Sequence, residues 1–160
     1  MEVKSERVKS EKLWGALLLL CCAFVLCSCN RPALYEYQAV SHDGWLSTDT
    51  LRYELKGVPH DGWYSLTLGV RYDDTYAYDD LWLVIERRQG DHARLRDTLH
   101  MTALQDTVGW QPRGSVLHEH EEMAAATRFT AQQMPVRLLV YHIMQRQRLT
   151  GIVDVGLKVE

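Results

Sequence analysis

Apolar side chains recur at every second position through most of this chain, and no other feature constrains its fold as strongly. The longest such run extends from Tyr64 to Tyr72, with Leu66, Leu68 and Val70 between them. A period of two places these side chains on one face of an extended strand, whereas a helix needs a period near 3.6. The chain beyond its amino-terminal segment is therefore predicted to be all-β.

Further segments are also predicted to be strands. The shorter ones lie near residues 35–39, 51–55, 95–101 and 153–159. Leu81–Glu86 is almost wholly apolar, as in a central strand covered on both faces, and Val136–Gln145 is also apolar on both faces. About seven to eight short strands predict an antiparallel β-sandwich of the jelly-roll kind, with a barrel as the alternative. Residues 146–151 are predicted to be the loop of a C-terminal hairpin.

One long stretch, Thr102–Gln133, breaks the alternation. It contains glycines, a proline and the polar run from His118 to Glu122. An irregular segment of this length is uncommon in a compact domain, and such insertions often carry contacts with a partner. Residues 120–128 are predicted to form a short helix within it.

The amino-terminal segment has the three parts of a bacterial export signal. Basic residues precede an apolar run from Leu13 to Leu26, and small residues follow it. The run has about 14 residues, fewer than the roughly 20 that a membrane-spanning helix needs, although an uncleaved anchor is the alternative.

The tetrapeptide Leu26-Cys27-Ser28-Cys29 resembles a lipobox, the processing site of bacterial lipoproteins. The resemblance implies that residues 1–28 are a lipoprotein signal peptide and that Cys29 carries covalent lipid. Residues 29–33 would then be a lipidated tether to a β-sandwich domain of residues 34–160. Asn30, rather than Asp, follows the cysteine, and no acidic cluster comes after it. These features favour the outer membrane, with the domain on the periplasmic face.

Cysteine content and charge indicate how the domain is stabilised and which partners it can have. All four cysteines lie between residues 21 and 29, so a domain that begins at Cys29 has no disulfide and must be stabilised by packing. Four of the 18 basic and three of the 21 acidic residues precede residue 29, which leaves 14 and 18, a net charge of −4. Without a basic patch, nucleic acid is not expected as a partner.

Two groups of histidines and carboxylates are candidate metal sites. The tetrapeptide His-Asp-Gly-Trp occurs at residues 42–45 and 60–63, and it favours two turns with packed tryptophans over a metal site. His118 and His120 would share one face of a strand and could chelate, but a solvated acidic segment is the favoured interpretation. No metal and no cofactor other than the lipid are predicted.

The segment Tyr72–Asp80 places four aspartates and three tyrosines between two strong strands. Aspartates favour turns, and the tyrosines are expected to cover one end of the sandwich. Contact with a protein partner, stacking on sugars and Ca²⁺ binding are the alternatives. Arg71 is predicted to pair with one of the loop aspartates and so hold Tyr76 and Tyr78 in place.

The chain contains no motif of nucleophilic or phosphate chemistry. It has no Gly-x-Ser-x-Gly sequence and no glycine-rich phosphate loop, and the only cysteine of the mature part would be acylated. No pair of catalytic acids can be placed face to face. An enzyme is therefore not expected.

Several segments, taken in order, resemble the gliding-motility lipoprotein family GldH of Bacteroidota. The resemblance covers nearly all of the mature chain and rests on Tyr35-Glu36-Tyr37, Gly44-Trp45, Arg71, Tyr76-x-Tyr78, Leu81-Trp82-Leu83, Asp97-Thr98-Leu99, Trp110 with Gly114, and the final block Gly151–Glu160. It implies a non-enzymatic outer-membrane lipoprotein that is linked to gliding and, through shared machinery, to type IX secretion.

The leading hypothesis is therefore a scaffold that binds other envelope lipoproteins or an outer-membrane protein. The rival is a carbohydrate-binding β-sandwich lipoprotein, suggested by the tyrosines of the loop and by the tryptophans. The residues predicted to contact the partner are Arg71, Tyr76, Tyr78 and Trp110.

Overall fold

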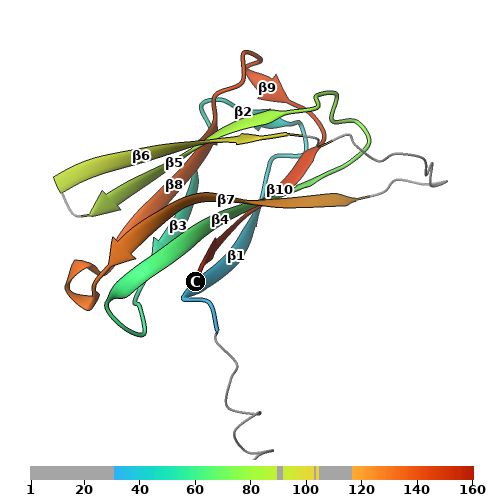
Figure 1. The fold of residues 1–160 in the computed structure, drawn as a ribbon. Helices are drawn as coiled ribbons and strands as arrows, with labels where there is room; N and C mark the ends of the chain where they lie inside the picture. Colours follow the sequence, from blue (N-terminus) through green and yellow to red (C-terminus); the bar gives the residue numbers. More distant parts are fainter. Residues whose placement is uncertain (1–30, 90–91, 103, 105–116) are drawn as a thin grey trace, which may run out of the picture. The chain divides into compact units, whose positions relative to one another are not determined.

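Alternating apolar residues build two four-stranded antiparallel sheets in the computed structural model (Figure 1). The structure describes residues 31–89, 92–102, 104 and 117–160. Sheet I contains, in order, β1 (Leu34–Ala39), β10 (Ile152–Val159), β4 (Gly62–Tyr72) and β7 (His118–Phe129). Sheet II contains, in order, β3 (Leu51–Leu55), β8 (Val136–His142), β5 (Leu81–Gln89) and β6 (His92–Met101).

The order of these strands is that of a jelly roll. The first main strand of the chain lies beside the last, and apart from the consecutive strands β5 and β6, neighbours within each sheet come from distant parts of the sequence. A further two-stranded sheet joins β2 (Trp45–Leu46) to β9 (Arg148–Leu149). The predicted all-β antiparallel sandwich is thus confirmed.

One apolar core lies between the two sheets. Sheet I contributes Leu66, Leu68 and Val70 from β4, and these side chains are fully buried. Sheet II contributes Leu81, Leu83 and Ile85 from β5, and all of these belong to the same buried cluster. The alternation that was visible in the sequence is therefore the alternation between core and outer face.

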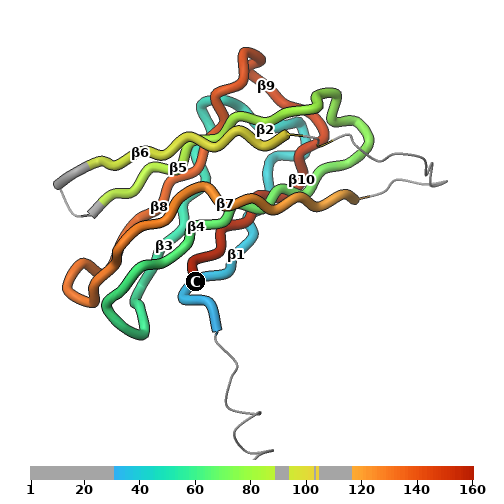
Figure 2. The backbone as a smooth tube through the Cα atoms, viewed as in Figure 1, coloured from blue at the N-terminus to red at the C-terminus, as the bar shows by residue number. Residues whose placement is uncertain are grey.

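The sandwich has two distinct ends, which can be followed along the backbone in Figure 2. Leu34 and Leu66 both pair with Val159, and the connections 56–61 and 130–135 lie at this same end. We call it the tether end, because the chain enters the domain here. The connections 73–80 and 143–147 lie at the opposite end, which we call the far end.

Two predictions for the stretch 102–133 were wrong. Residues 118–129 form strand β7, neither an irregular insertion nor a helix, and among the residues of this stretch that the structure describes only the single turn η1 (Ala131–Gln133) is helical. β7 forms one edge of sheet I, and its half-buried positions carry His118, His120 and small residues instead of large apolar ones. The sequence therefore shows no apolar alternation there. Residues 103 and 105–116 lie outside the described part of the chain.

The predicted C-terminal hairpin was also wrong. β8 ends at His142 and pairs with β3 and β5, whereas β10 pairs with β1 and β4 of the other sheet. The segment between them crosses from one sheet to the other, and on the way it forms β9. Of the two repeated tryptophans, Trp45 is buried in the core as expected, but Trp63 is exposed.

Candidate functional site

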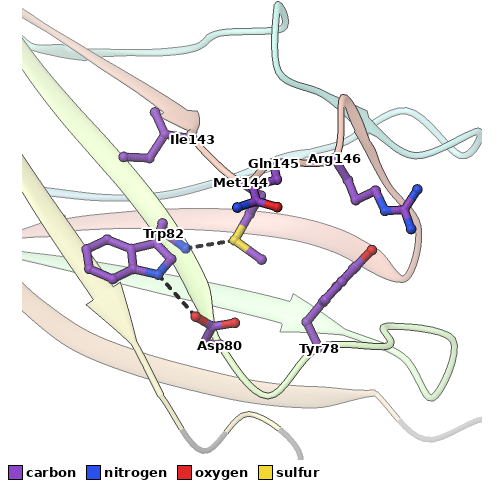
Figure 3. Close-up of a pocket in the computed structure, with 7 residues that line it drawn as sticks. All are labelled: Tyr78, Asp80, Trp82, Ile143, Met144, Gln145 and Arg146. Atoms are coloured by element: carbon purple, nitrogen blue, oxygen red, sulfur yellow. Dashed lines mark hydrogen bonds between the residues drawn. The ribbon is translucent and has the colours of Figure 1, made fainter.

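A pocket of about 560 Å³ opens at the far end of sheet II. The connection 73–80 forms one wall, and the segment after β8 forms the other (Figure 3). Its lining consists of Tyr78, Asp80, Trp82, Ile143, Met144, Gln145 and Arg146. Tyr78 is the one predicted site residue found there.

The apolar wall of this pocket follows from strand alternation in β5. Leu81 and Leu83 point into the core, so Trp82 between them points outward and remains 37% exposed. The backbone N–H of Trp82 donates to Met144 Sδ at 3.4 Å, and that of Ile143 donates to the Trp82 carbonyl at 3.0 Å. The wall is thus held by contacts to backbone atoms, which favours a preformed pocket.

Asp80 fixes two aromatic rings beside the pocket. Its carboxylate accepts a hydrogen bond from Trp82 Nε1 at 3.1 Å and lies 3.0 Å from His100 Nε2. The His100 ring stacks on the indole of Trp82 with 3.9 Å between ring centroids. One face of the indole is therefore covered, and the carboxylate is already engaged.

Tyr76 supports the pocket from inside the domain. Its side chain is only 2% exposed, packs against Tyr78, and donates a hydrogen bond to the Asp80 carbonyl at 2.8 Å. Burial, and then the nearby carboxylate of Asp80, raise the pKa of the Tyr76 phenol. A buried phenol cannot serve as a platform for a sugar, so this part of the carbohydrate hypothesis is not supported.

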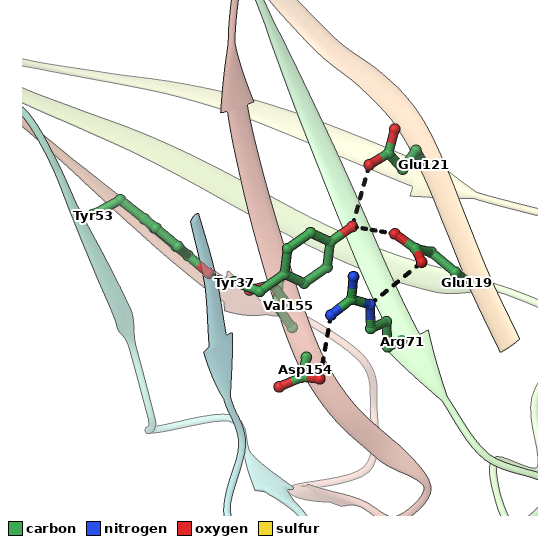
Figure 4. A network of polar contacts seen from close by, with 7 residues as sticks. All are labelled: Tyr37, Tyr53, Arg71, Glu119, Glu121, Asp154 and Val155. Atoms are coloured by element: carbon green, nitrogen blue, oxygen red, sulfur yellow. Dashed lines mark hydrogen bonds and ion pairs between the residues drawn. The ribbon is translucent and has the colours of Figure 1, made fainter. Parts of the chain in front are cut away.

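Arg71 lies elsewhere, on the outer face of sheet I (Figure 4). Its guanidinium contacts Glu119 at 3.3 Å and Asp154 at 3.9 Å, and it lies 3.9 Å above the ring centre of Tyr37. The prediction that Arg71 pairs with an aspartate of the 73–80 loop was therefore wrong. Arg71 and Tyr72 are consecutive in β4, so Arg71 points to the outer face and Tyr72 to the core.

Tyr37 connects the four strands of sheet I across this outer face. From β1 it reaches over Gly156 of β10 and Gly69 of β4, which are paired with each other. Its hydroxyl donates to Glu119 at 2.8 Å and also lies 3.2 Å from Glu121, both on β7. A Cβ at position 156 would lie 2.4 Å from the Tyr37 ring, so only glycine leaves room for it.

The electrostatics of this network are those of a structural cluster. Burial, and then the hydrogen bond to Glu119, raise the pKa of the Tyr37 phenol. The Tyr37 hydroxyl is the main reason that the pKa of Glu119 is lowered, and Arg71 adds to it against the effect of burial. Arg71 contacts carboxylates of β7 and β10, and the Tyr37 hydroxyl of β1 reaches two glutamates of β7, so the cluster ties the strands of sheet I together.

The histidines singled out at residues 118 and 120 each contact a different carboxylate. His118 stacks on Tyr72 and its Nε2 is 2.9 Å from Asp74, while His120 lies 3.7 Å from Glu122. In the described part of the chain, no group of three or more His, Cys, Asp or Glu side chains could hold a metal ion. None of the helices found in that part is long and apolar enough to cross a membrane.

Two predicted residues, Cys29 and Trp110, lie outside the described residues. Trp82, Ile143 and Met144 were not singled out from the sequence, although they form the apolar wall of the pocket. Trp82 could have been found from strand parity, which places a large aromatic residue on the outer face. Ile143 and Met144 could not be found in this way, because they lie in the predicted strand Val136–Gln145, which is apolar on both faces.

Comparisons with known proteins give one match that identifies the chain. A search of curated proteins finds no match. Among solved structures, "Structure of Eiger TNF from S. frugiperda" is similar with a TM-score of 0.36 and 16% identity, covering 80% of this chain and 92% of that chain. The sequence profile described as GldH lipoprotein matches residues 33–159, which is most of the chain. This protein therefore belongs to the GldH lipoprotein family.

Proposed function

We propose that this protein is an outer-membrane lipoprotein, acylated on Cys29 and facing the periplasm. In this proposal it acts as a non-enzymatic scaffold of the envelope machinery for gliding motility and type IX secretion. Residues 1–28 are then the signal peptide, 29–33 the tether and 34–160 the binding domain. Membership of the GldH lipoprotein family and the lipobox at Leu26–Cys29 support this assignment.

The position of the pocket is the observation that favours a scaffold. It opens at the far end, whereas the chain enters the sandwich at the tether end. A domain held to the bilayer through Cys29 would therefore present Tyr78, Trp82 and Ile143 away from its lipid. Aromatic and methionine side chains around a pocket are typical of sites that anchor a partner's apolar side chain.

The same lining favours a protein over a sugar as the ligand. His100 covers one face of the Trp82 indole, and Asp80 is already hydrogen-bonded to both rings. The exposed apolar part of the lining is mainly Ile143, which is 47% exposed, with the partly exposed Met144 and Trp82, and the exposed polar side chains of Gln145 and Arg146 lie beside it. We infer that an envelope protein inserts an apolar side chain here.

Site-specific crosslinking in the native envelope tests this proposal. A photo-crosslinking residue replaces Gln145, which is exposed and lines the pocket, in the acylated protein in its own cells. We expect a discrete crosslinked partner protein. In addition, Ile143→Arg should reduce its yield about tenfold, equivalent to about 1.4 kcal/mol of binding free energy.

Met123→Arg is the matched control, because Met123 is 61% exposed on β7 of the other sheet and has acidic neighbours. It should leave the yield unchanged. Recovery of the protein without a partner, or equal yields from the two variants, would count against the pocket.

Binding on a glycan array that is lost in Trp82→Ala would instead support the carbohydrate alternative. Mass spectrometry of the native amino terminus, with membrane fractionation, tests the lipid on Cys29 and its location.

A further inference from the structure

The tether end carries a large aromatic side chain, Trp63, that is mostly exposed. Trp63 lies near the start of β4 and is 73% exposed. It faces outward because Tyr64 and Leu66 of the same strand point into the core. Tyr35 of β1 is exposed on the same outer face of sheet I.

The strand register places Trp63 at the end of the sandwich where the chain enters the domain. Leu34 and Leu66 both pair with Val159, so they lie at the same level in sheet I. Trp63 is three residues before Leu66, which puts it about 10 Å further toward the tether end. Cys29 is five residues before Leu34, and so short a segment spans about 17 Å at most. A lipid on Cys29 would thus bring Trp63 to within about one headgroup layer of the bilayer.

We propose that the tether end is a membrane-contact surface, in which the Trp63 indole inserts into the interfacial layer of the bilayer that holds the lipid on Cys29. This inference rests on the proposed acylation of Cys29. An indole has an apolar body and one N–H donor, and side chains of this kind collect at the boundary between headgroups and acyl chains. The contact would orient the domain so that the pocket faces away from the membrane.

The charges at this end suit a lipid surface of either charge. The connection before Trp63 carries Lys56 and Asp61, and Arg128 of β7 is paired with Trp63 in the strand register. Asp61 already accepts a hydrogen bond from the Ala131 backbone at 2.9 Å. Lys158 and Glu160 pair with each other at 2.7 Å. Without a block of like charge, the contact depends on the indole and needs no anionic lipid. We therefore expect it to be insensitive to salt.

Contact quenching of tryptophan fluorescence tests the inference. The acylated protein is purified from membranes and reconstituted into phosphatidylethanolamine vesicles that contain phosphatidylcholine brominated on the upper part of its acyl chains. Bromine quenches an indole that touches it. We expect quenching in the wild-type protein, a loss of at least half of it in Trp63→Phe, and no loss in Trp82→Phe. Trp82 is the matched control, since it is partly exposed at the far end.

Flotation of the vesicles distinguishes a failure of the proposed membrane contact of Trp63 from a failure of the proposed acylation of Cys29. All three proteins should float with the vesicles, because the acyl chains alone retain them. Floating proteins that are quenched equally in wild type and Trp63→Phe would overturn the membrane contact and leave the lipid anchor intact. Protein that does not float would overturn the anchor and the contact together. If Trp63 is shielded from acrylamide in native membranes but is not quenched by brominated lipid, a protein partner covers it and the inference is wrong.

Discussion

At the scale of single residues, His142 is a buried side chain through which pH affects the stability of the fold. It lies at the end of β8, where Nε2 donates to the Trp45 carbonyl at 3.2 Å and the ring packs edge-on against the indole. Nδ1 is buried and has no hydrogen-bond partner among the residues that the structure describes. Protonation would place a second N–H there with nothing to accept it, and burial accordingly lowers the pKa of His142.

The protein should therefore lose stability in mild acid. The folded state has the lower pKa, so the unfolded chain binds the proton more readily. The His142 contribution is complete above the ordinary pKa of 6.5 and decreases as the pH falls below it. His142→Gln keeps a donor for the Trp45 carbonyl and cannot be protonated. Its melting temperature should fall less between about pH 7 and about pH 5 than that of the wild type. Parallel curves for the two proteins would contradict this explanation.

Glu86 is, with His142, one of the two buried charged or polar side chains among the described residues, and it lies on the outer face of sheet II. Arg88 and Arg96 both bond its carboxylate, the latter at 2.7 Å. Burial alone would raise the pKa of Glu86, but the hydrogen bonds from Arg88 and Arg96 outweigh it and lower the pKa.

Glu86→Gln should consequently destabilise the protein by about 1–3 kcal/mol near neutral pH, because it removes a carboxylate that accepts charge-assisted bonds. The contribution is present above the ordinary carboxyl pKa of 4.5 and is lost as the pH falls through the lower folded value. Urea denaturation of both proteins at neutral pH and near pH 3 measures it. A difference of the same size at both pH values would show that the loss has another cause.

At the scale of elements, β1 is joined to the rest of sheet I by side chains as well as by its backbone. The Tyr37 ring lies over Gly156 and Gly69, and its hydroxyl reaches two glutamates of β7. Glycine inside a strand normally weakens it, but here it leaves space for a ring that packs across three neighbouring strands.

Gly156→Ala should cost about 1–3 kcal/mol of unfolding free energy, because its Cβ would meet the Tyr37 ring at 2.4 Å. Tyr37→Ala removes that ring, so the double variant should be less destabilised than the sum of the two single variants. A double-mutant cycle by urea denaturation measures the coupling. Additive effects would mean that the ring does not constrain position 156.

The elements also show what the sequence could and could not predict. β4 and β5 were predictable because their buried faces are apolar at every second position or throughout. β7 was not, since an edge strand needs no large apolar face, and His118 and His120 occupy its half-buried positions. The pairing of β8 and β10 failed for a different reason. Alternation identifies strands but carries no information about their partners, and these two consecutive main strands lie in different sheets.

The same limit applies to the candidate site. Tyr78 was singled out as a loop aromatic, and it lines the pocket, but its contact with a partner stays a prediction. Arg71 was placed in the wrong network because its true partners, Glu119 and Asp154, are distant in the sequence. Residues that meet only through sheet topology cannot be grouped from local spacing.

At the scale of the whole molecule, the proposed tether length and the two ends of the sandwich together set the orientation of the domain. A flexible insertion of about 20 Gly and Ser residues between Pro32 and Ala33 would add roughly 25 Å of average reach. We expect this variant to float with vesicles as the wild type does, but to lose most of the quenching of Trp63 by brominated lipid. Unchanged quenching would mean that the indole finds the bilayer without help from the short tether. An insertion of the same length in the 56–61 connection is not a suitable control, because it would alter the contact surface itself.

The place of β1 in sheet I has a consequence for how the chain is made. Among the described strands, β1 pairs with β10 alone. The first of these strands to be synthesised therefore has no pairing partner until the last of them has been made. A polypeptide threaded amino end first through a translocation channel cannot close this sheet until Ile152–Val159 has emerged. A prematurely terminated copy would display two unsatisfied strand edges, one on β1 and one on β4, and exposed edges of this kind can pair with another chain and aggregate.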